Sequence, residues 1–83
     1  MEALSRKLEF DKKGQMVFTF GDNWSLSVIN NGYGASEGLF EIAPMADDNI
    51  QYVEGISTEL DDVRGYLTEE QVFEYVDKMA KIT

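Results

Sequence analysis

Apolar residues occupy every second position in two segments of the chain, residues 15–20 and residues 23–30. A period of two turns one face of an extended strand toward a core and the other toward solvent. Both segments are also rich in the aromatic and β-branched residues that favour strands. The alternating apolar positions are Met16, Phe18, Phe20, Trp24, Leu26 and Val28. We therefore predict two β-strands over these ranges.

Three further segments carry weaker strand patterns. Residues 38–43 predict a third main strand, which Pro44 should end because proline has no N–H to donate to a neighbouring strand. Residues 50–56 predict a last strand, and residues 8–10 predict a first one. The intervening residues 11–14 begin with Asp and end with Gly, which suits a type I turn closed by a glycine. A hairpin is therefore expected at the start of the chain.

Helical periodicity replaces strand alternation at the end of the chain. Thr68 and Gln71 have the spacing of a capping box, in which each side chain accepts a hydrogen bond from the backbone of the other. Leu67 and Val72 flank this box as a hydrophobic staple. Apolar residues then recur at helical spacing, at Val72, Phe73, Tyr75, Val76, Met79, Ala80 and Ile82. We predict a helix over residues 69–82.

These elements predict one α+β domain covering residues 1–83. Eighty-three residues leave no room for a second domain. Short connections place strands that are neighbours in the sequence side by side. We therefore expect an antiparallel meander sheet of four to five strands, with the C-terminal helix packed on one face. Residues 57–64 fit either a loop or a short helical turn capped by Ser57, and we favour the loop.

The chain contains neither histidine nor cysteine. Disulfides, thiolate zinc sites and imidazole-dependent nucleophiles are therefore excluded. Carboxylates alone could form a hydrolytic pair or bind Ca²⁺ or Mg²⁺, but the acidic residues lack the spaced loop that calcium sites use. The sequence around Gly32 and Gly34 lacks the lysine and the following helix of a phosphate loop. We expect no enzyme activity, no catalytic residue, no cofactor and no metal site.

Charge is the most unusual bulk property of the chain. Sixteen acidic residues oppose seven basic ones, for a formal net charge of −9. No Lys or Arg occurs between Lys13 and Arg64, so this stretch disfavours contact with a phosphate backbone. Aromatic residues that stack on nucleic-acid bases have basic surroundings, which this stretch lacks. We therefore expect its aromatic residues to belong to the core. Acidic surfaces keep small domains dispersed, but they also steer a protein toward a basic surface on a partner.

If the acidic residues steer the chain toward a partner, acids from separate turns should gather on one flank and meet a partner protein with a basic surface. An exposed loop tyrosine adds contact area at a low entropic cost. The candidate partner-binding residues are Tyr33, Glu37, Glu41, Asp47, Asp48, Asp61 and Asp62. Alternatively, an exposed sheet edge or the helix face pairs with a second copy of the chain. That alternative predicts a homodimer with a structural role.

The first seven residues lack the apolar core of a signal peptide. No stretch of the chain approaches the roughly 20 apolar residues that a membrane-spanning helix requires. We therefore expect a cytoplasmic protein that contacts neither a membrane nor nucleic acid directly.

Four segments together resemble small uncharacterised proteins of tailed bacteriophages: residues 20–29, 33–34, 38–43 and 62–68. The resemblance extends over residues 16–82 and rests on strand and turn residues rather than on a catalytic motif. It implies an accessory phage protein made in the bacterial cytoplasm. Acidic phage proteins of this size include inhibitors of host defence, among them anti-CRISPR and anti-restriction proteins, some of which mimic the charge of DNA. By analogy of class, the resemblance implies an inhibitor of a host protein.

Overall fold

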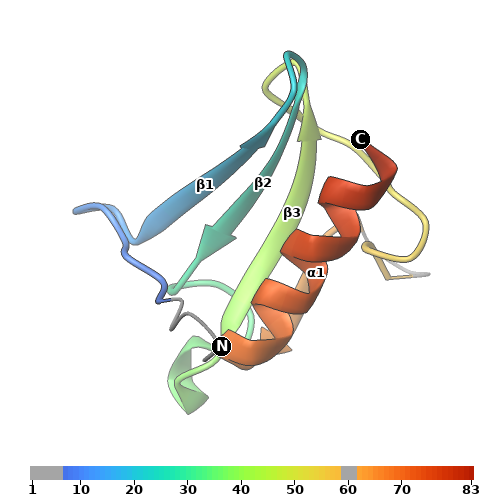
Figure 1. The fold of residues 1–83 in the computed structure, drawn as a ribbon. Coiled ribbons are helices and arrows are strands. Elements are labelled where there is room, and N and C mark those ends of the chain that lie inside the picture. Colours follow the sequence, from blue (N-terminus) through green and yellow to red (C-terminus); the bar gives the residue numbers. More distant parts are fainter. Residues whose placement is uncertain (1–6, 59–61) are drawn as a thin grey trace, which may run out of the picture.

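The fold is an antiparallel sheet with one helix across it, as the sequence predicts (Figure 1). The computed structural model describes residues 7–58 and 62–83. Its elements are β1 (Gln15–Phe20), β2 (Trp24–Ile29), the short 3₁₀ helix η1 (Ala35–Glu37), β3 (Phe40–Ala46), β4 (Asn49–Ile50), β5 (Arg64–Leu67) and α1 (Glu69–Ile82). The strands β1 to β4 follow one another as a meander, and β5 pairs with β3. Since β2 occupies one edge of β3, β4 and β5 share the other edge.

The two strands with the clearest alternation are confirmed. In β1, Val17 is 47% exposed whereas Phe18 packs against the core. The register sets Phe20 opposite Trp24, so a three-residue turn at 21–23 joins β1 to β2. Alternation in the sequence therefore located these strands within one residue at each end.

The predicted strand over residues 8–10 is wrong. These residues form no strand, and Phe10 instead stacks on Phe40 with ring centroids 5.4 Å apart. The predicted turn after them is present, because Gly14 N–H donates to the carbonyl of Asp11 at 3.0 Å. The apolar residues of this segment serve packing rather than strand pairing.

The prediction that Pro44 ends the third strand is also wrong, since β3 continues to Ala46. The carbonyl of Pro44 accepts a hydrogen bond from Gln51 N–H at 2.9 Å. The nitrogen and carbonyl of one residue in an extended strand point to the same side. The missing N–H of Pro44 therefore faces Gln51, the residue just past β4, and the pairing of β3 with this segment lacks one bond there while β3 itself continues.

Of the predicted strand over residues 50–56, only Ile50 lies in a strand, the two-residue β4. A turn replaces its second half, because the N–H groups of Ile56 and Ser57 both donate to the carbonyl of Val53, at 3.0 and 2.8 Å. Sequence reasoning missed β5, which begins at Arg64. The described part of the segment before it has no helix or strand, as favoured, and residues 59–61 lie outside the described residues.

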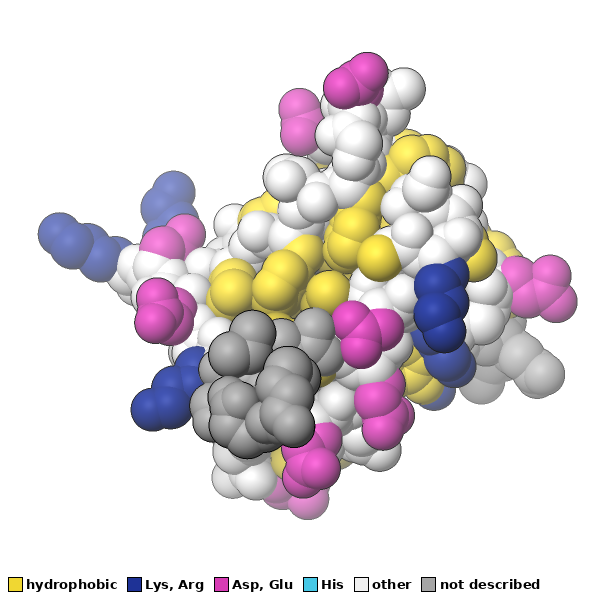
Figure 2. Space-filling view, viewed as in Figure 1, with side chains coloured by type: hydrophobic (Ala, Val, Ile, Leu, Met, Phe, Trp, Pro, Cys, Tyr) yellow, Lys and Arg dark blue, Asp and Glu magenta, His cyan; other side chains and the backbone are white. Residues whose placement is uncertain are grey.

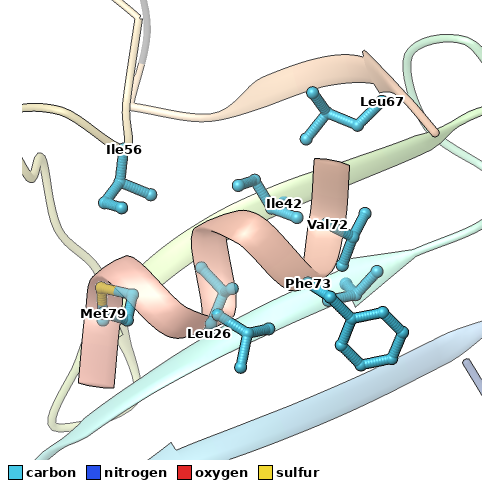
Figure 3. Packing of buried hydrophobic residues seen from close by; sticks show 9 residues of the cluster. Leu26, Ile42, Ile56, Leu67, Val72, Phe73 and Met79 are labelled. Atoms are coloured by element: carbon cyan, nitrogen blue, oxygen red, sulfur yellow. The ribbon is translucent and has the colours of Figure 1, made fainter. Parts of the chain in front are cut away.

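The predicted helix is confirmed with its cap. Gln71 N–H donates to the Thr68 hydroxyl at 3.2 Å, and Thr68 N–H donates to the Gln71 side chain at 2.9 Å. Ala80, expected in the apolar stripe, is exposed. Figure 3 shows side chains of α1 and of the sheet converging on one core. Ile56, from the segment between β4 and β5, and Leu67, from β5, complete this core. This core comprises Leu26, Val28, Ile42, Ile56, Leu67, Val72, Phe73, Val76 and Met79.

Candidate partner-binding surfaces

The predicted partner-binding residues lie at both ends of β3 rather than on one flank. Asp47 and Asp48 form the turn after β3, whereas Tyr33 and Glu37 belong to the loop before it. Figure 2 shows acidic side chains on several sides of the molecule, in keeping with this division. Asp62 is exposed before β5, and Asp61 lies outside the described residues. The two ends of β3 are therefore separate surfaces.

At the first end, two glycine–tyrosine pairs pack main chain against main chain. Tyr66 N–H donates to the carbonyl of Tyr33 at 3.1 Å. A Cβ atom on Gly34 would lie 2.9 Å from the Cα of Tyr66, and one on Gly65 would overlap the Cβ of Tyr33. Only glycine permits so close an approach at both positions. The sequence thus holds Tyr33 and Tyr66 beside each other.

Both tyrosines are presented to solvent, each with 58% of its surface exposed. Tyr66 has a φ of 58°, which is an unfavourable conformation for a bulky residue. The pairing of β3 with β5 is irregular between Phe40 and Ile42, as expected where a strand bulges. Strained backbone of this kind persists where its surroundings impose it, and it is concentrated at functional sites.

Carboxylates accompany the two tyrosines. Glu37 is exposed in η1. Glu41 is half-buried, and its Oε1 accepts the N–H of Tyr33 at 2.9 Å, so this residue also holds the loop in place. We call the surface formed by Tyr33, Glu37, Glu41 and Tyr66 the tyrosine surface. Sequence reasoning missed Tyr66 because residues 30–39 and β5 are far apart in the sequence and come into contact only once β5 has paired with β3.

The nearest basic residue along the chain, Arg64, is engaged elsewhere. Its Nε donates to the carbonyl of Ile56 at 2.8 Å, and its guanidinium lies over the ring of Tyr75, 5.0 Å from the centroid. Lys78 lies over the same ring at 5.1 Å. These contacts hold the Arg64 guanidinium against α1 and the loop that carries Ile56.

At the other end of β3, Asp47 and Asp48 have φ values of 52° and 66°. Two successive residues at positive φ are typical of the type I′ turn, which matches the twist of a hairpin. Asp47 N–H donates to the carbonyl of Asn23 at 2.9 Å, so Asp22 of the preceding turn lies close by. The three aspartates line a hollow of about 230 Å³. We call Asp22, Asp47 and Asp48 the acidic tip.

Asp22 was not among the predicted residues. It is far from Asp47 in the sequence, and only the pairing of Trp24 with Ala46 brings the two turns together. A register assignment for β2 and β3 would have revealed it.

Neither surface has the arrangement of a metal site. Within residues 7–58 and 62–83, no group of three or more carboxylate side chains is close enough to hold a metal ion. No helix in this part of the chain is long and apolar enough to cross a membrane.

Comparison of the chain with protein-family models, with curated proteins and with solved structures finds no match.

Proposed function

We propose that this domain is a phage-encoded inhibitor that binds a basic surface of a host protein in the bacterial cytoplasm, and that the tyrosine surface is its contact. The observation that carries this proposal is the glycine-mediated packing that exposes Tyr33 and Tyr66 beside acidic side chains. No catalysis is involved, because inhibition requires only that the partner surface be covered.

The chemistry of the tyrosine surface suits a partner rich in arginine and lysine. Tyrosine contributes a large apolar area with a polar tip, and it is enriched at interfaces and at their energetic centres. Its ring also attracts cations. Glu37 supplies an exposed charge at the same place, and carboxylates form charge-assisted hydrogen bonds with a guanidinium.

The net charge of −9 supports the same kind of partner. Long-range attraction raises the rate of encounter with a basic surface and fades as salt is added. Basic surfaces that normally hold nucleic acid are the most strongly charged targets of this type. An acidic domain bound there excludes the nucleic acid, and the inhibitor itself contacts no DNA or RNA.

Affinity capture from bacterial lysate tests the proposal. The bait is the full chain, compared with the double variant Tyr33→Ala/Tyr66→Ala. Tyr52→Ala is the matched control, because Tyr52 is also exposed, at 45%, but follows β4 near the other end of β3. Circular dichroism verifies that each variant is folded.

We expect the chain to capture a nucleic-acid-binding protein that duplex DNA displaces. The double variant should lose this protein and Tyr52→Ala should retain it. Recovery only of proteins without a nucleic-acid-binding surface, or equal capture by the double variant, would contradict the proposal.

A second candidate function is a structural phage accessory protein that works as a homo-oligomer. The observation that favours it is the outer side of β1, which the described residues leave without a neighbouring strand. Affinity capture separates the two candidates, since a purely structural homo-oligomer would recover no host protein that duplex DNA displaces.

A further inference from the structure

The outer side of β1 is an open sheet edge. Gly14 accepts the N–H of Asn30 at 3.0 Å, so the even-numbered residues of this segment direct their backbone groups toward β2. Gln15 shows the opposite orientation, because its carbonyl accepts from Asp11 N–H and its N–H donates to Asp11 Oδ1. Val17 and Thr19 have the same orientation as Gln15. Their N–H and C=O groups point outward, and no described residue bonds to them.

The chain before β1 turns away from this edge. Phe10 stacks on Phe40, and Leu8 N–H donates to Glu69 Oε2 at 2.9 Å, at the start of α1. Residues 9–11 contact only the start of β1, at Gln15 and Met16, and the chain then reaches the helix, so no described residue bonds the outward groups of Val17 and Thr19. In Figure 2, hydrophobic side chains reach the surface between β1 and α1. An open edge next to exposed apolar area is the arrangement that pairs with another strand.

We propose that two copies of the chain associate through β1, antiparallel to each other, about a twofold axis at Phe18. In this register Val17 lies opposite the partner's Thr19, and Thr19 lies opposite the partner's Val17. Each pair exchanges both of its backbone hydrogen bonds.

Neighbouring registers fail for identifiable reasons. An axis at Val17 would require Gln15 as a hydrogen-bonding residue, and Asp11 already bonds its outward groups. An axis at Thr19 would require Gly21, which has left the strand with a φ of 66°. Only the axis at Phe18 uses the outward groups of both free residues.

Charge complementarity favours a second copy as the occupant. Lys12 and Lys13 precede β1, and the acidic tip lies at its far end. Antiparallel pairing brings the start of β1, which follows Lys12 and Lys13, to the same end of the joined strands as the partner's Asp22, which follows the end of the partner's β1. Antiparallel pairing repeats this contact on both sides of the axis. Lys12 and Lys13 would thus face a surface of opposite charge, the acidic tip of the partner.

The side chains of β1 are complementary as well. On the α1 side of the sheet, Phe18 lies opposite the partner's Phe18 and Met16 lies opposite the partner's Phe20. In the single chain, the side chains of Met16, Phe18 and Phe20 are only half-buried. Aromatic and apolar pairs across strands stabilise a sheet. The dimer would therefore extend the core across the twofold axis.

This assembly goes beyond the proposed function and is compatible with it. The tyrosine surface involves β5, which lies across the sheet from β1 with β2 and β3 between them. Each dimer would present two tyrosine surfaces, and failure of either proposal leaves the other unaffected.

Sedimentation equilibrium of the full chain, from micromolar to millimolar concentration, tests the proposal. We expect a monomer–dimer equilibrium that Val17→Pro abolishes and Val17→Thr preserves. Proline is tolerated where an edge N–H faces solvent, so the pairing of β1 with β2 should survive. Hydrogen exchange supplies an independent readout, because the amides of Val17 and Thr19 should become protected as the concentration rises. A monomer at all concentrations, or a dimer that a folded Val17→Pro variant retains, overturns the proposal.

A charge exchange tests the register without altering the strand. Lys13→Glu and Asp22→Lys should each weaken the dimer about fivefold, and the double variant should recover the original dissociation constant. Tyr33→Ala is the control and should leave dimerisation unchanged. Additive weakening in the double variant overturns the register.

Discussion

At the scale of single residues, two glycines decide where the aromatic contact area lies. Gly34 is buried with a φ of 96°. The atom nearest to a Cβ added at Gly34 would be the Cα of Tyr66, and main chain cannot move aside as a flexible side chain can. A Cβ atom on Gly65 would overlap the Cβ of Tyr33 and lie 3.0 Å from its carbonyl oxygen, and neither atom can move without the main chain. Tyr33 and Tyr66 are thus exposed side by side because the adjacent residues, Gly34 and Gly65, have no Cβ atom.

Gly34→Ala should destabilise the fold by about 2 kcal/mol, because it combines an unfavourable φ with a steric overlap. Gly38→Ala is the matched control, since Gly38 has a φ of 74° but no atom within 4 Å of an added Cβ. Its cost should be about 1 kcal/mol, from backbone conformation alone. Urea unfolding measures both, and equal losses would contradict the packing described.

Asp11 gives the hairpin entry a dependence on pH. Hydrogen bonding from Gln15 N–H holds the pKa of Asp11 below its ordinary 3.8, with a further contribution from Lys13. A depressed folded-state pKa stabilises the fold above the unfolded-state value, and this stabilisation is lost as pH falls through the folded-state value.

Asp11→Asn keeps an acceptor oxygen but removes the titrating charge. The melting temperature of the original chain should exceed that of this variant at neutral pH, and the difference should shrink as the pH falls below 3.8. Thermal melts across that range measure the difference. A difference that does not change with pH would show that the charge of Asp11 contributes nothing.

At the scale of elements, the sequence predicts those strands and helices whose local pattern is long and regular. Alternation located β1 and β2, and the capping box located the start of α1. The four-residue β5 has too short a pattern, and the positive φ of Tyr66 interrupts it. Its existence depends on the free edge of β3, which no local window contains. Likewise, Pro44 could be recognised as a strand residue only once its place opposite Gln51, just past the two-residue β4, was known.

The candidate surfaces follow the same division. Tyr33, Asp47 and Asp48 were recognisable as exposed turn and loop residues, and the structure leaves them exposed. Tyr66 and Asp22 were not, because each joins its surface through strand pairing. Composition could count the acids but could not locate them in space.

Thr68→Ala should cost about 1 kcal/mol, because it removes the hydroxyl that accepts the N–H of Gln71 at the start of α1. Ser36→Ala, at an exposed position of η1, is the control and should change the free energy of unfolding by less than about 0.5 kcal/mol. Chemical denaturation compares the two. A negligible effect of Thr68→Ala would mean that tertiary packing alone fixes the helix start.

At the scale of the whole molecule, the charge of −9 acts on the two proposed associations in opposite ways. It attracts a basic partner and repels a second copy. Salt at about 0.1 M screens charges beyond roughly 10 Å, while the closer pairing of Lys13 with the partner's Asp22 is screened less. Raising the salt from low to physiological concentration should therefore strengthen the dimer and weaken binding to the basic partner.

Sedimentation in a salt series measures the dimer, and surface plasmon resonance in the same buffers measures the captured partner. Salt dependences of the same sign would show that one of the two contacts has a different electrostatic origin.

The most direct test of the central claim is hydrogen exchange of the domain bound to its captured host protein. The tyrosine surface predicts new protection in residues 30–39 and in β5, with residues 47–53 unchanged. Protection confined to the acidic tip or to β1 would contradict the assignment of partner binding to Tyr33 and Tyr66.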